Sequence, residues 1–420
     1  MIDCAVVTIR PKTSNKRLLG LTLLERTLLT ARQAGIGRFI VCAGNNQSDG
    51  LPTPDQIRRL HQKGIDIQLE STDNHRHSIP EGDNILLLQG NSVFTPATLT
   101  RLLNVPVPNG GLCVAVSEGE EFAGIAVASP VVASMLLDDA TGESGCVDMP
   151  FIRSLVPRDL LVEQTVESGR LVSIESKQDI AEARKLLLRS ARKKEDGFVA
   201  KHFNRPISLA FTRLLLAFNI TPTQVTMVNL AIGLLSGYFI GKGGHLNSFL
   251  GGLLFQCASI FDGCDGEIAR LTFQSSEFGT KLDNICDILT LIIFLVNLPI
   301  GIYSTNQNPL YLYLGGLMLV SVATIYIQMR LFVKKTRLTG SIVKIVQDIQ
   351  AKDKQAQPSV LDRVAANIAF IFRMDFIKMM IFIIAAFDGR IVILWALILL
   401  SPIESIYLNI YARQKLRKII

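Results

Sequence analysis

The second half of the chain is a series of long apolar segments. From about residue 207 onward, polar side chains become rare over windows of roughly 20 residues, the helix length needed to cross a bilayer. Residues 1 to 200 have no comparable window and carry Gly, Asp and Lys throughout. The pattern predicts six transmembrane helices, at residues 223–240, 246–268, 282–302, 310–333, 376–387 and 391–411.

The first half alternates short apolar runs with amphipathic segments. The run AVVTIR is followed by the amphipathic segment LLGLTLLERTLLTARQ and then by a second apolar run, FIVCA. Later, the stretch NILLLQGNSVFTPATLTRLL repeats the order of strand and helix. Such alternation favours a parallel α/β sheet. We therefore predict an α/β domain at residues 1–195 and an all-α membrane domain of six helices at residues 196–420.

Composition and charge agree with a membrane protein. A mean hydropathy of +0.34 with 19% charged residues is too apolar for an ordinary soluble chain of 420 residues. The net charge of +7 is concentrated at residues 184–201, 330–354 and 413–418, which flank apolar spans. This distribution is typical of cytoplasmic loops rather than of nucleic-acid binding. We predict a multi-pass protein of the cell (inner) membrane whose N-terminal domain and C-terminus are cytoplasmic, with the lipid bilayer and no nucleic acid as partner.

The segment before the first span mixes basic and apolar side chains. In HFNRPISLAFTRLLLAFNITP, Arg205 and Arg213 alternate with leucine and phenylalanine, and Pro222 follows. This mixture predicts an amphipathic helix on the cytosolic membrane face. The alternative is an extension of the soluble domain.

Four aspartates lie between the second and third apolar spans, in FDGCDGEIARLTFQSSEFGTKLDNICD. Asp262 and Asp265 are three residues apart, and Asp283 and Asp287 are four apart, so each pair shares one face of a helix. Charged side chains at bilayer depth cost at least ~2.5 to 3.5 kcal/mol each, so they persist mainly where they pair or bind ions. Four carboxylates together favour a site for hard divalent cations, which prefer oxygen ligands.

Other residues of the same stretch fit a phosphate ligand. Arg270 supplies a fixed positive charge suited to phosphate. Gly266, Ala269 and Gly279 remove side-chain bulk where a ligand or a neighbouring backbone must come close. The stretch therefore predicts a diphosphate held by metal.

The same residues resemble the signature of a known family. The segment DGCDGEIAR, followed after eight residues by Gly279 and then by Asp283 and Asp287, is similar to the motif of the CDP-alcohol phosphotransferases, also called CDP-alcohol phosphatidyltransferases. The resemblance covers about residues 196–412. It implies a membrane enzyme of six helices that transfers a substituted phosphate from a CDP-linked donor, such as CDP-diacylglycerol or a CDP-polyol, to an alcohol acceptor and releases CMP. It also implies a homodimer.

The resemblance assigns roles residue by residue. It implies that two Mg²⁺ or Mn²⁺ ions are bound by Asp262, Asp265, Asp283 and Asp287, and that Asp287 is also the catalytic general base. The shorter stretch TPTQVT is similar to a second family feature at the cytidine pocket. Together these likenesses place the nucleotide site at Thr223, Thr226, Gly266, Ala269, Arg270, Ser276 and Gly279.

Some functions stay open at the level of sequence. Relatives that use inositol phosphates commonly have Arg after the fourth aspartate, whereas Ile288 stands here, so the alcohol is not named by the motif. Two rival functions are a metal-dependent membrane prenyltransferase, which also holds a diphosphate through aspartates, and a non-catalytic ion-binding or transport protein.

The α/β half resembles a second family over residues 1–190, the sugar-phosphate nucleotidyltransferases. Active members have a Gly-rich loop after the first strand, but here the loop TIRPKTSNKR has no glycine before Gly20. Where the family has a metal-binding Asp after Gly, this chain has Gly90 and then Asn91. We therefore predict a degenerate domain without nucleotidyltransferase activity, retained as a scaffold or regulatory domain.

Overall fold

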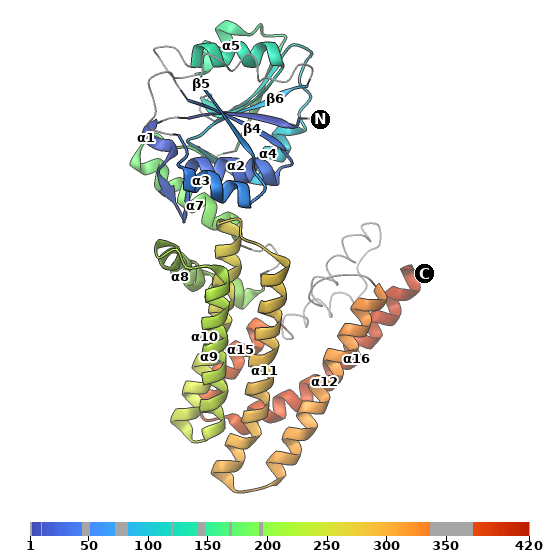
Figure 1. Ribbon diagram of the computed structural model, residues 1–420. Helices are drawn as coiled ribbons and strands as arrows, with labels where there is room; N and C mark the ends of the chain where they lie inside the picture. Colours follow the sequence, from blue (N-terminus) through green and yellow to red (C-terminus); the bar gives the residue numbers. More distant parts are fainter. Residues whose placement is uncertain are drawn as a thin grey trace. The chain divides into compact units, whose positions relative to one another are not determined.

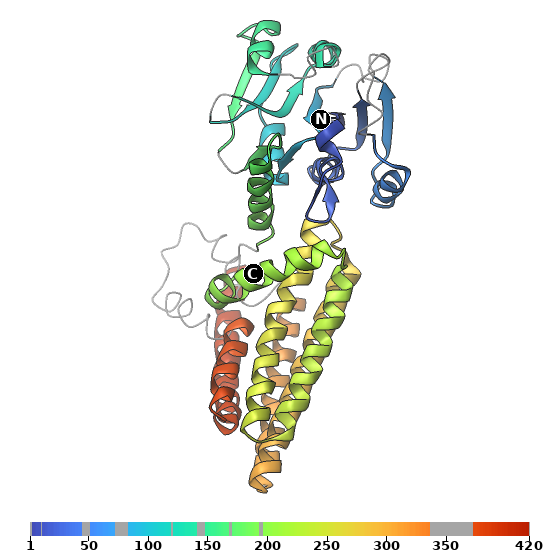
Figure 2. The same cartoon turned by 90° about the vertical axis from the view of Figure 1, so that its left-hand side faces the viewer.

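The chain folds into two compact units (Figures 1 and 2). One contains Met1–Ala191 with Leu271–Phe273, and the other contains Arg192–Arg270 with Gln274–Ile420. The structure is a computed structural model, and it describes residues 2–9, 11–43, 51–71, 83–118, 121–140, 148–167, 170–192, 196–336 and 373–419. The basic connection predicted near residues 337–354 lies outside the described residues.

A seven-stranded sheet forms the centre of the first unit (Figure 1). Its order is β10-β8-β9-β6-β1-β4-β5. These strands are β1 (Cys4–Thr8), β4 (Arg38–Ala43), β5 (Ile67–Ser71), β6 (Ile85–Gln89), β8 (Leu112–Val116), β9 (Phe122–Ala128) and β10 (Leu161–Thr165). Two further pairs are antiparallel, namely β2 (Arg17–Leu18) with β3 (Leu21–Thr22) and β7 (Ser92–Phe94) with β11 (Leu171–Ser173).

The main sheet is largely parallel. Strand β1 pairs in parallel with β4 and β6, β4 with β5, and β8 with β10. Strand β9 is antiparallel to both β6 and β8. Only residues 117–121 connect β8 to β9, and so short a connection joins antiparallel rather than parallel neighbours. The predicted α/β sheet is confirmed, with one antiparallel strand that the sequence reading did not include.

Helices cover both faces of this sheet. Along β1, Ala5 and Val7 pack into one apolar cluster, whereas Cys4 and Val6 pack into another on the opposite face. The first cluster includes side chains of α2, α3 and α4, and the second includes side chains of α5 and α6. Figure 1 shows α5 on one side of the sheet and α2, α3 and α4 on the other. The helices of the unit are α1 (Pro11–Ser14), α2 (Leu23–Gln33), α3 (Pro54–Gln62), α4 (Pro96–Leu103), α5 (Pro130–Ala140), α6 (Met149–Leu155) and α7 (Lys177–Ser190).

The second unit is helical throughout its described residues, as predicted. Its first long helix, α9, begins where a capping box forms: the Thr221 hydroxyl accepts from the Gln224 N–H, and the Gln224 side chain accepts from the Thr221 N–H. The elements are η2 (Ala200–Asn204), α8 (Arg205–Ala217), α9 (Pro222–Lys242), α10 (His245–Leu271), α11 (Glu277–Asn306), α12 (Leu310–Thr336), α15 (Met374–Ala386) and α16 (Arg390–Ile419).

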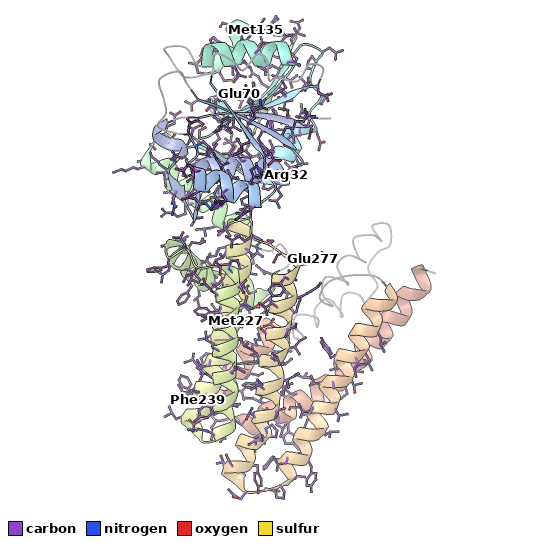
Figure 3. All side chains as sticks on the ribbon, in the orientation of Figure 1. Arg32, Glu70, Met135, Met227, Phe239 and Glu277 are labelled. Atoms are coloured by element: carbon purple, nitrogen blue, oxygen red, sulfur yellow. The ribbon has the colours of Figure 1, made fainter. Side chains whose placement is uncertain are left out.

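Helices α9 and α11 pack closely and run in the same direction. Gly233 lies against Thr290, and further along both helices Gly237 lies against Ile293. A methyl group at either glycine would clash with the facing side chain, so these glycines permit the close approach. The outer side of α9 presents exposed apolar side chains, as expected of a surface in contact with lipid, namely Met227 (Figure 3), Val228, Leu234, Leu235 and Tyr238.

Six helices lie at the six predicted spans, but they differ in length and in the number of charged residues. Among the described residues, three are long and apolar enough to cross a membrane: Pro222–Lys242, Glu277–Asn306 and Leu310–Gln328. Helix α15 has 13 residues, fewer than the roughly 20 of a simple crossing. Helix α10 is long, but its last turns contain two aspartates, a glutamate and an arginine. The helical fold is thus confirmed, and the count of six crossings stays a prediction.

Candidate active site

The four aspartates come from two neighbouring helices. Asp262 and Asp265 lie near the end of α10, and Asp283 and Asp287 lie near the start of α11. The short connection 272–276 turns the chain so that these two helix ends meet. One carboxylate oxygen from each of Asp262, Asp283 and Asp287 lies within 4.8 Å of the others. The structure therefore brings three of the predicted metal ligands into one cluster.

The fourth aspartate adjoins this cluster but has its own support. Asp283 interacts electrostatically with Asp262, Asp265 and Asp287, so all four carboxylates share one site. Asp265 is buried, and its Oδ2 accepts a hydrogen bond of 2.7 Å from the Thr226 hydroxyl of α9. The structure thus places the Thr226 hydroxyl in contact with one of the predicted metal ligands. Its predicted contact with nucleotide stays a prediction.

The donor set fits a hard divalent cation. Several carboxylates this close together repel one another unless a positive charge lies between them. The Asp283 Oδ1 atom is buried and has no hydrogen-bond partner among the residues that the structure describes. A buried carboxylate oxygen without a partner, on a residue grouped with other carboxylates, fits a Mg²⁺ or Mn²⁺ site, because both ions take oxygen ligands.

The remaining predicted nucleotide residues lie around the same helix ends. A Cβ atom on Gly266 would lie 3.1 Å from Arg270 Nη1, so the glycine leaves room for the guanidinium along α10. Arg270 also interacts electrostatically with Asp265. The Ser276 hydroxyl caps α11 by accepting from the Gly279 N–H at 3.0 Å. Ala269 is partly buried on α10, and Thr223 is exposed in the first turn of α9.

Two buried polar residues of the helical unit, one of them beside Asp287, escaped the sequence reading. Lys378 of α15 is buried, and its Nζ lies 3.9 Å from Asp287 Oδ1 and 5.5 Å from the centroid of the Phe255 ring. Asn229 of α9 is also buried, and its Oδ1 has no hydrogen-bond partner in the described part of the chain. Their only sequence signal was a single polar residue in an apolar run, FIKMMIFII for Lys378 and MVNLAIG for Asn229.

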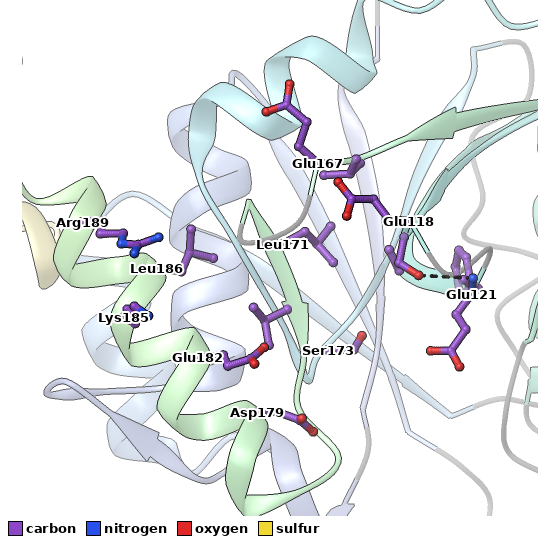
Figure 4. A pocket seen from close by; sticks show the side chains of 15 residues that line it. Glu118, Glu121, Glu167, Leu171, Ser173, Asp179, Glu182, Lys185, Leu186 and Arg189 are labelled. Atoms are coloured by element: carbon purple, nitrogen blue, oxygen red, sulfur yellow. Dashed lines mark hydrogen bonds between the residues drawn. The ribbon is translucent and has the colours of Figure 1, made fainter.

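The α/β unit contains a separate cavity of about 540 Å³ (Figure 4). The charged residues of its lining are mostly acidic, with Glu118, Glu121, Glu167, Asp179 and Glu182 beside Lys185 and Arg189. Several of these charges already have partners. Asp179 accepts hydrogen bonds from the Ser176 and Glu175 N–H groups, which lower its pKa, and Glu167 pairs with Arg170 at 2.7 Å. Among the residues that the structure describes, no side chain lining the cavity is a buried polar group without a hydrogen-bond partner.

Comparison with protein families assigns the helical site to a class. Residues 219–401 match the CDP-alcohol phosphatidyltransferase family, and this stretch includes all four aspartates. The C-terminal part of the chain is therefore a CDP-alcohol phosphatidyltransferase domain.

Curated relatives are of two kinds. The chain is 28% identical over 303 residues to a bifunctional IPC transferase and DIPP synthase of Rubrobacter xylanophilus, covering 64% of this chain and 69% of that protein. A protein described in the same words from Thermococcus kodakarensis is 34% identical over 148 residues, which is 35% of this chain and 32% of that one. An archaetidylinositol phosphate synthase of Pyrococcus horikoshii is 32% identical over 90 residues, or 21% and 46% of the two chains. The matched stretch spans about a third of the Thermococcus kodakarensis protein and of a protein described in the same words from Archaeoglobus fulgidus.

Solved structures similar to the N-terminal part include proteins described as nucleotidyltransferases. One is the inositol-1-phosphate CTP transferase from T. maritima, with 12% identity and a TM-score of 0.32 over 44% of this chain and 96% of that one. Another is a nucleotidyl transferase from Methanothermobacter, with 19% identity and a TM-score of 0.33 over 44% and 98% of the two chains.

Proposed function

We propose that this protein is an integral membrane enzyme that transfers a substituted phosphate from a CDP-linked donor to an alcohol and releases CMP. The observation that carries the proposal is the acidic cluster on α10 and α11, in which three carboxylate oxygens lie within 4.8 Å of one another and Asp283 Oδ1 is unpartnered among the described residues. The family match over residues 219–401 supports the same reaction class. The relatives' descriptions as synthases agree with an enzyme.

The residues of the site divide into ligands and a base. Asp262, Asp265, Asp283 and Asp287 would hold two Mg²⁺ or Mn²⁺ ions. When bound, such ions neutralise the diphosphate and stabilise the leaving CMP. Arg270 adds a fixed cation for a phosphate oxygen. Thr223, Thr226, Gly266, Ala269, Ser276 and Gly279 complete the proposed nucleotide site.

Asp287 performs the proton transfer in this proposal. Its carboxylate takes the proton of the acceptor hydroxyl, and the hydroxyl oxygen attacks the phosphorus that carries the substituent. A new P–O bond forms to the alcohol, and the bond from that phosphorus to the oxygen of CMP breaks. The nearby Lys378 ammonium, 3.9 Å from Asp287 Oδ1, offsets part of the negative charge of the cluster.

The identity of the alcohol is the next question for this site. One curated relative is described as an archaetidylinositol phosphate synthase, which makes polyol phosphates the first acceptors to test. Radiolabelled CDP-diacylglycerol and CDP-alcohols should each be offered with a panel of alcohols, and CMP release should be measured. We expect CMP to be released only when one class of donor and one class of acceptor are both present. Release that never depends on an added or lipid alcohol would contradict a transferase.

We propose that the α/β unit has no nucleotidyltransferase activity. The loop after β1 forms the short helix α1, and Ser14 at its end is fully buried beside Gly90. Asn91 is also fully buried, its amide nitrogen donates to the Ile174 carbonyl at 3.2 Å, and its neutral amide lacks the charge of the acidic metal ligand that it replaces.

This proposal predicts that CTP is not consumed. Purified protein given CTP with sugar or polyol phosphates should release no pyrophosphate above background, because neither a glycine-rich phosphate loop nor the acidic ligand is present. An active nucleotidyltransferase assayed in parallel controls for the conditions. Robust turnover that is lost on changing Lys16 or Arg17 would show that the glycine-free loop binds nucleotide after all.

We propose that the protein lies in the inner membrane with both termini and the α/β unit on the cytoplasmic side, because segments rich in Lys and Arg are expected on that side. Asn306 ends α11 at the end opposite the aspartates. A cysteine introduced at Asn306 should therefore react with an impermeant thiol reagent added outside intact cells, whereas one at Gln355 should react only after the cells are opened. The unmodified chain measures the background from native cysteines. The reverse pattern would invert the topology.

We also propose that the protein is a homodimer through its membrane helices, as the family resemblance implies. Among the exposed apolar side chains of the described helices, those of α12 form an extended set that a second copy or lipid would cover, including Leu312, Tyr313, Leu317, Val320 and Ile327. Cross-linking in membranes at these positions distinguishes a dimer contact from lipid contact.

A further inference from the structure

The aspartate-bearing helix has a second polar face that does not take part in the acidic cluster. Glu267 lies in the same motif as Asp265 and Arg270, yet its side chain is fully buried against α8. Its Oε1 accepts hydrogen bonds from Arg205 Nη1 at 2.9 Å and from the Ser208 hydroxyl at 2.7 Å. Its Oε2 accepts one from the Thr212 hydroxyl at 2.8 Å. Both oxygens of this carboxylate are therefore engaged by one helix.

The cation in this arrangement is held from two sides. Arg205 is buried, and besides Glu267 it binds Asp196 through Nε at 2.7 Å and Nη2 at 2.8 Å. Burial by itself would lower the pKa of Arg205, but its hydrogen bonds and charge pairs with Asp196 and Glu267 raise the pKa above the ordinary value. Arg205 is thus a permanent cation fixed by two carboxylates.

Neighbouring motif residues fit the same surface of α8. A Cβ atom on Gly263 would lie 2.9 Å from Arg205 Nη1 and 3.2 Å from the Ser208 hydroxyl, so the glycine makes room for both side chains. The Cys264 thiol lies 3.4 Å from the Ser208 carbonyl oxygen. Gly263, Cys264 and Glu267 therefore contact α8, whereas Asp262 and Asp265 belong to the acidic cluster.

We propose that Glu267 is a positioning residue, which fixes the rotation of α10 through α8 so that Asp262, Asp265 and Arg270 face the metal and nucleotide. This proposal rests on the proposed function of the acidic cluster. A rigid helix transmits any rotation at Glu267 to Asp265, two residues away, and to Arg270, three residues away. A buried ion pair is not needed for stability, since apolar residues of similar size often replace one without loss. Instead, three directional hydrogen bonds to one carboxylate specify a single orientation of α10 relative to α8.

The test separates positioning from ordinary stabilisation. Glu267→Gln keeps the size of the side chain but removes its charge, and Thr212→Val removes the hydroxyl that donates to Glu267 with little change in shape. Glu163→Gln is a matched control, because Glu163 forms an Arg–Glu pair at 2.9 Å with Arg153 in the α/β unit. Calorimetric titration with Mn²⁺, alone and with CDP, gives an affinity and a number of competent sites for each variant. Thermal unfolding gives stability separately.

We expect Glu267→Gln to weaken Mn²⁺ and CDP binding and to lower turnover per competent site by about 10- to 10²-fold, as misplacement of about 1 Å can do. Thr212→Val should shift the same quantities in the same direction by less, and Glu163→Gln should shift neither. A lower unfolding midpoint or fewer competent sites, with wild-type affinity and turnover at the sites that remain, would overturn positioning. If Glu267→Gln does not fold, the affinity of Thr212→Val decides by the same criteria.

A double substitution provides a second test of the positioning role. Arg205→Met combined with Glu267→Met should fold at least as well as Arg205→Met alone, because it leaves one carboxylate, that of Asp196, without its cation instead of two. Reduced Mn²⁺ affinity in this folded protein supports the positioning role, and full affinity contradicts it. Wild-type protein that binds Mn²⁺ but releases no CMP from any donor would overturn the proposed reaction, and the comparison of affinities would still decide the role of Glu267.

Discussion

Asp287→Asn is expected to lower turnover by at least about 10²-fold while leaving cytidine-nucleotide affinity within roughly tenfold. A general base contributes typically 10²- to 10⁴-fold to rate, and asparagine cannot accept the proton at neutral pH. Asparagine keeps the size of the side chain and one oxygen, and Asp262, Asp265 and Asp283 remain to hold metal and diphosphate. The measurement is CMP release together with CDP binding by calorimetry.

Asp262→Asn is the matched comparison. Asp262 belongs to the same group of three carboxylates but is not the proposed base, so its replacement should weaken metal and nucleotide binding together. Near-normal turnover in Asp287→Asn would show that another group takes the proton. Normal binding and turnover in both variants would move the active site away from α10 and α11.

Chelation of divalent metal should abolish CMP formation altogether. The carboxylates of α10 and α11 coexist at close range only when positive charge lies between them, and the diphosphate needs the same charge to leave as CMP. Excess EDTA should reduce activity to background, and Mg²⁺ or Mn²⁺ should restore it. Calcium-selective chelation with EGTA in the presence of excess Mg²⁺ serves as the control and should have no effect. Full activity in excess EDTA would contradict the metal-dependent reaction.

The sequence was sufficient to place the acidic site because helical spacing is local information. Intervals of three and four residues put each aspartate pair on one face, and the short polar turn LTFQSSEF indicated that the two helices are neighbours. The structure adds that Asp265, besides its interaction with the other carboxylates, accepts a hydrogen bond from the Thr226 hydroxyl of α9. That arrangement depends on the packing of α9 against α10, which no local pattern specifies.

Residues that act through distant partners could not be predicted. Glu267 resembled one more charge in an acidic motif, because Thr212, Ser208 and Arg205 lie 55, 59 and 62 residues away in the sequence. Lys378 lies on α15, in an apolar run where a single lysine suggests only a membrane boundary. Tertiary packing alone brings its Nζ to 3.9 Å from Asp287.

In the α/β unit the pattern of apolar runs predicted the layers but not every strand direction. Buried strands such as β8 and β9 have nearly continuous apolar sequences, so periodicity does not distinguish a parallel from an antiparallel neighbour. The direction of β9 follows from the short connection at residues 117–121. Likewise, the missing glycines predicted that the loop after β1 is not a phosphate loop, but not that it forms α1.

The identity of the leaving group tests the central claim most directly. Purified protein with Mg²⁺ should be given CDP-diacylglycerol or a CDP-alcohol labelled in the cytidine, with the panel of alcohols, and in parallel a labelled prenyl diphosphate. The account predicts that labelled CMP appears in equal amount to the newly formed phosphodiester, and that the prenyl diphosphate stays intact. Pyrophosphate release from the prenyl diphosphate, with every CDP-linked donor unchanged, would contradict it and identify a prenyltransferase. Metal binding without turnover of any donor would contradict it in favour of an ion-binding or transport protein.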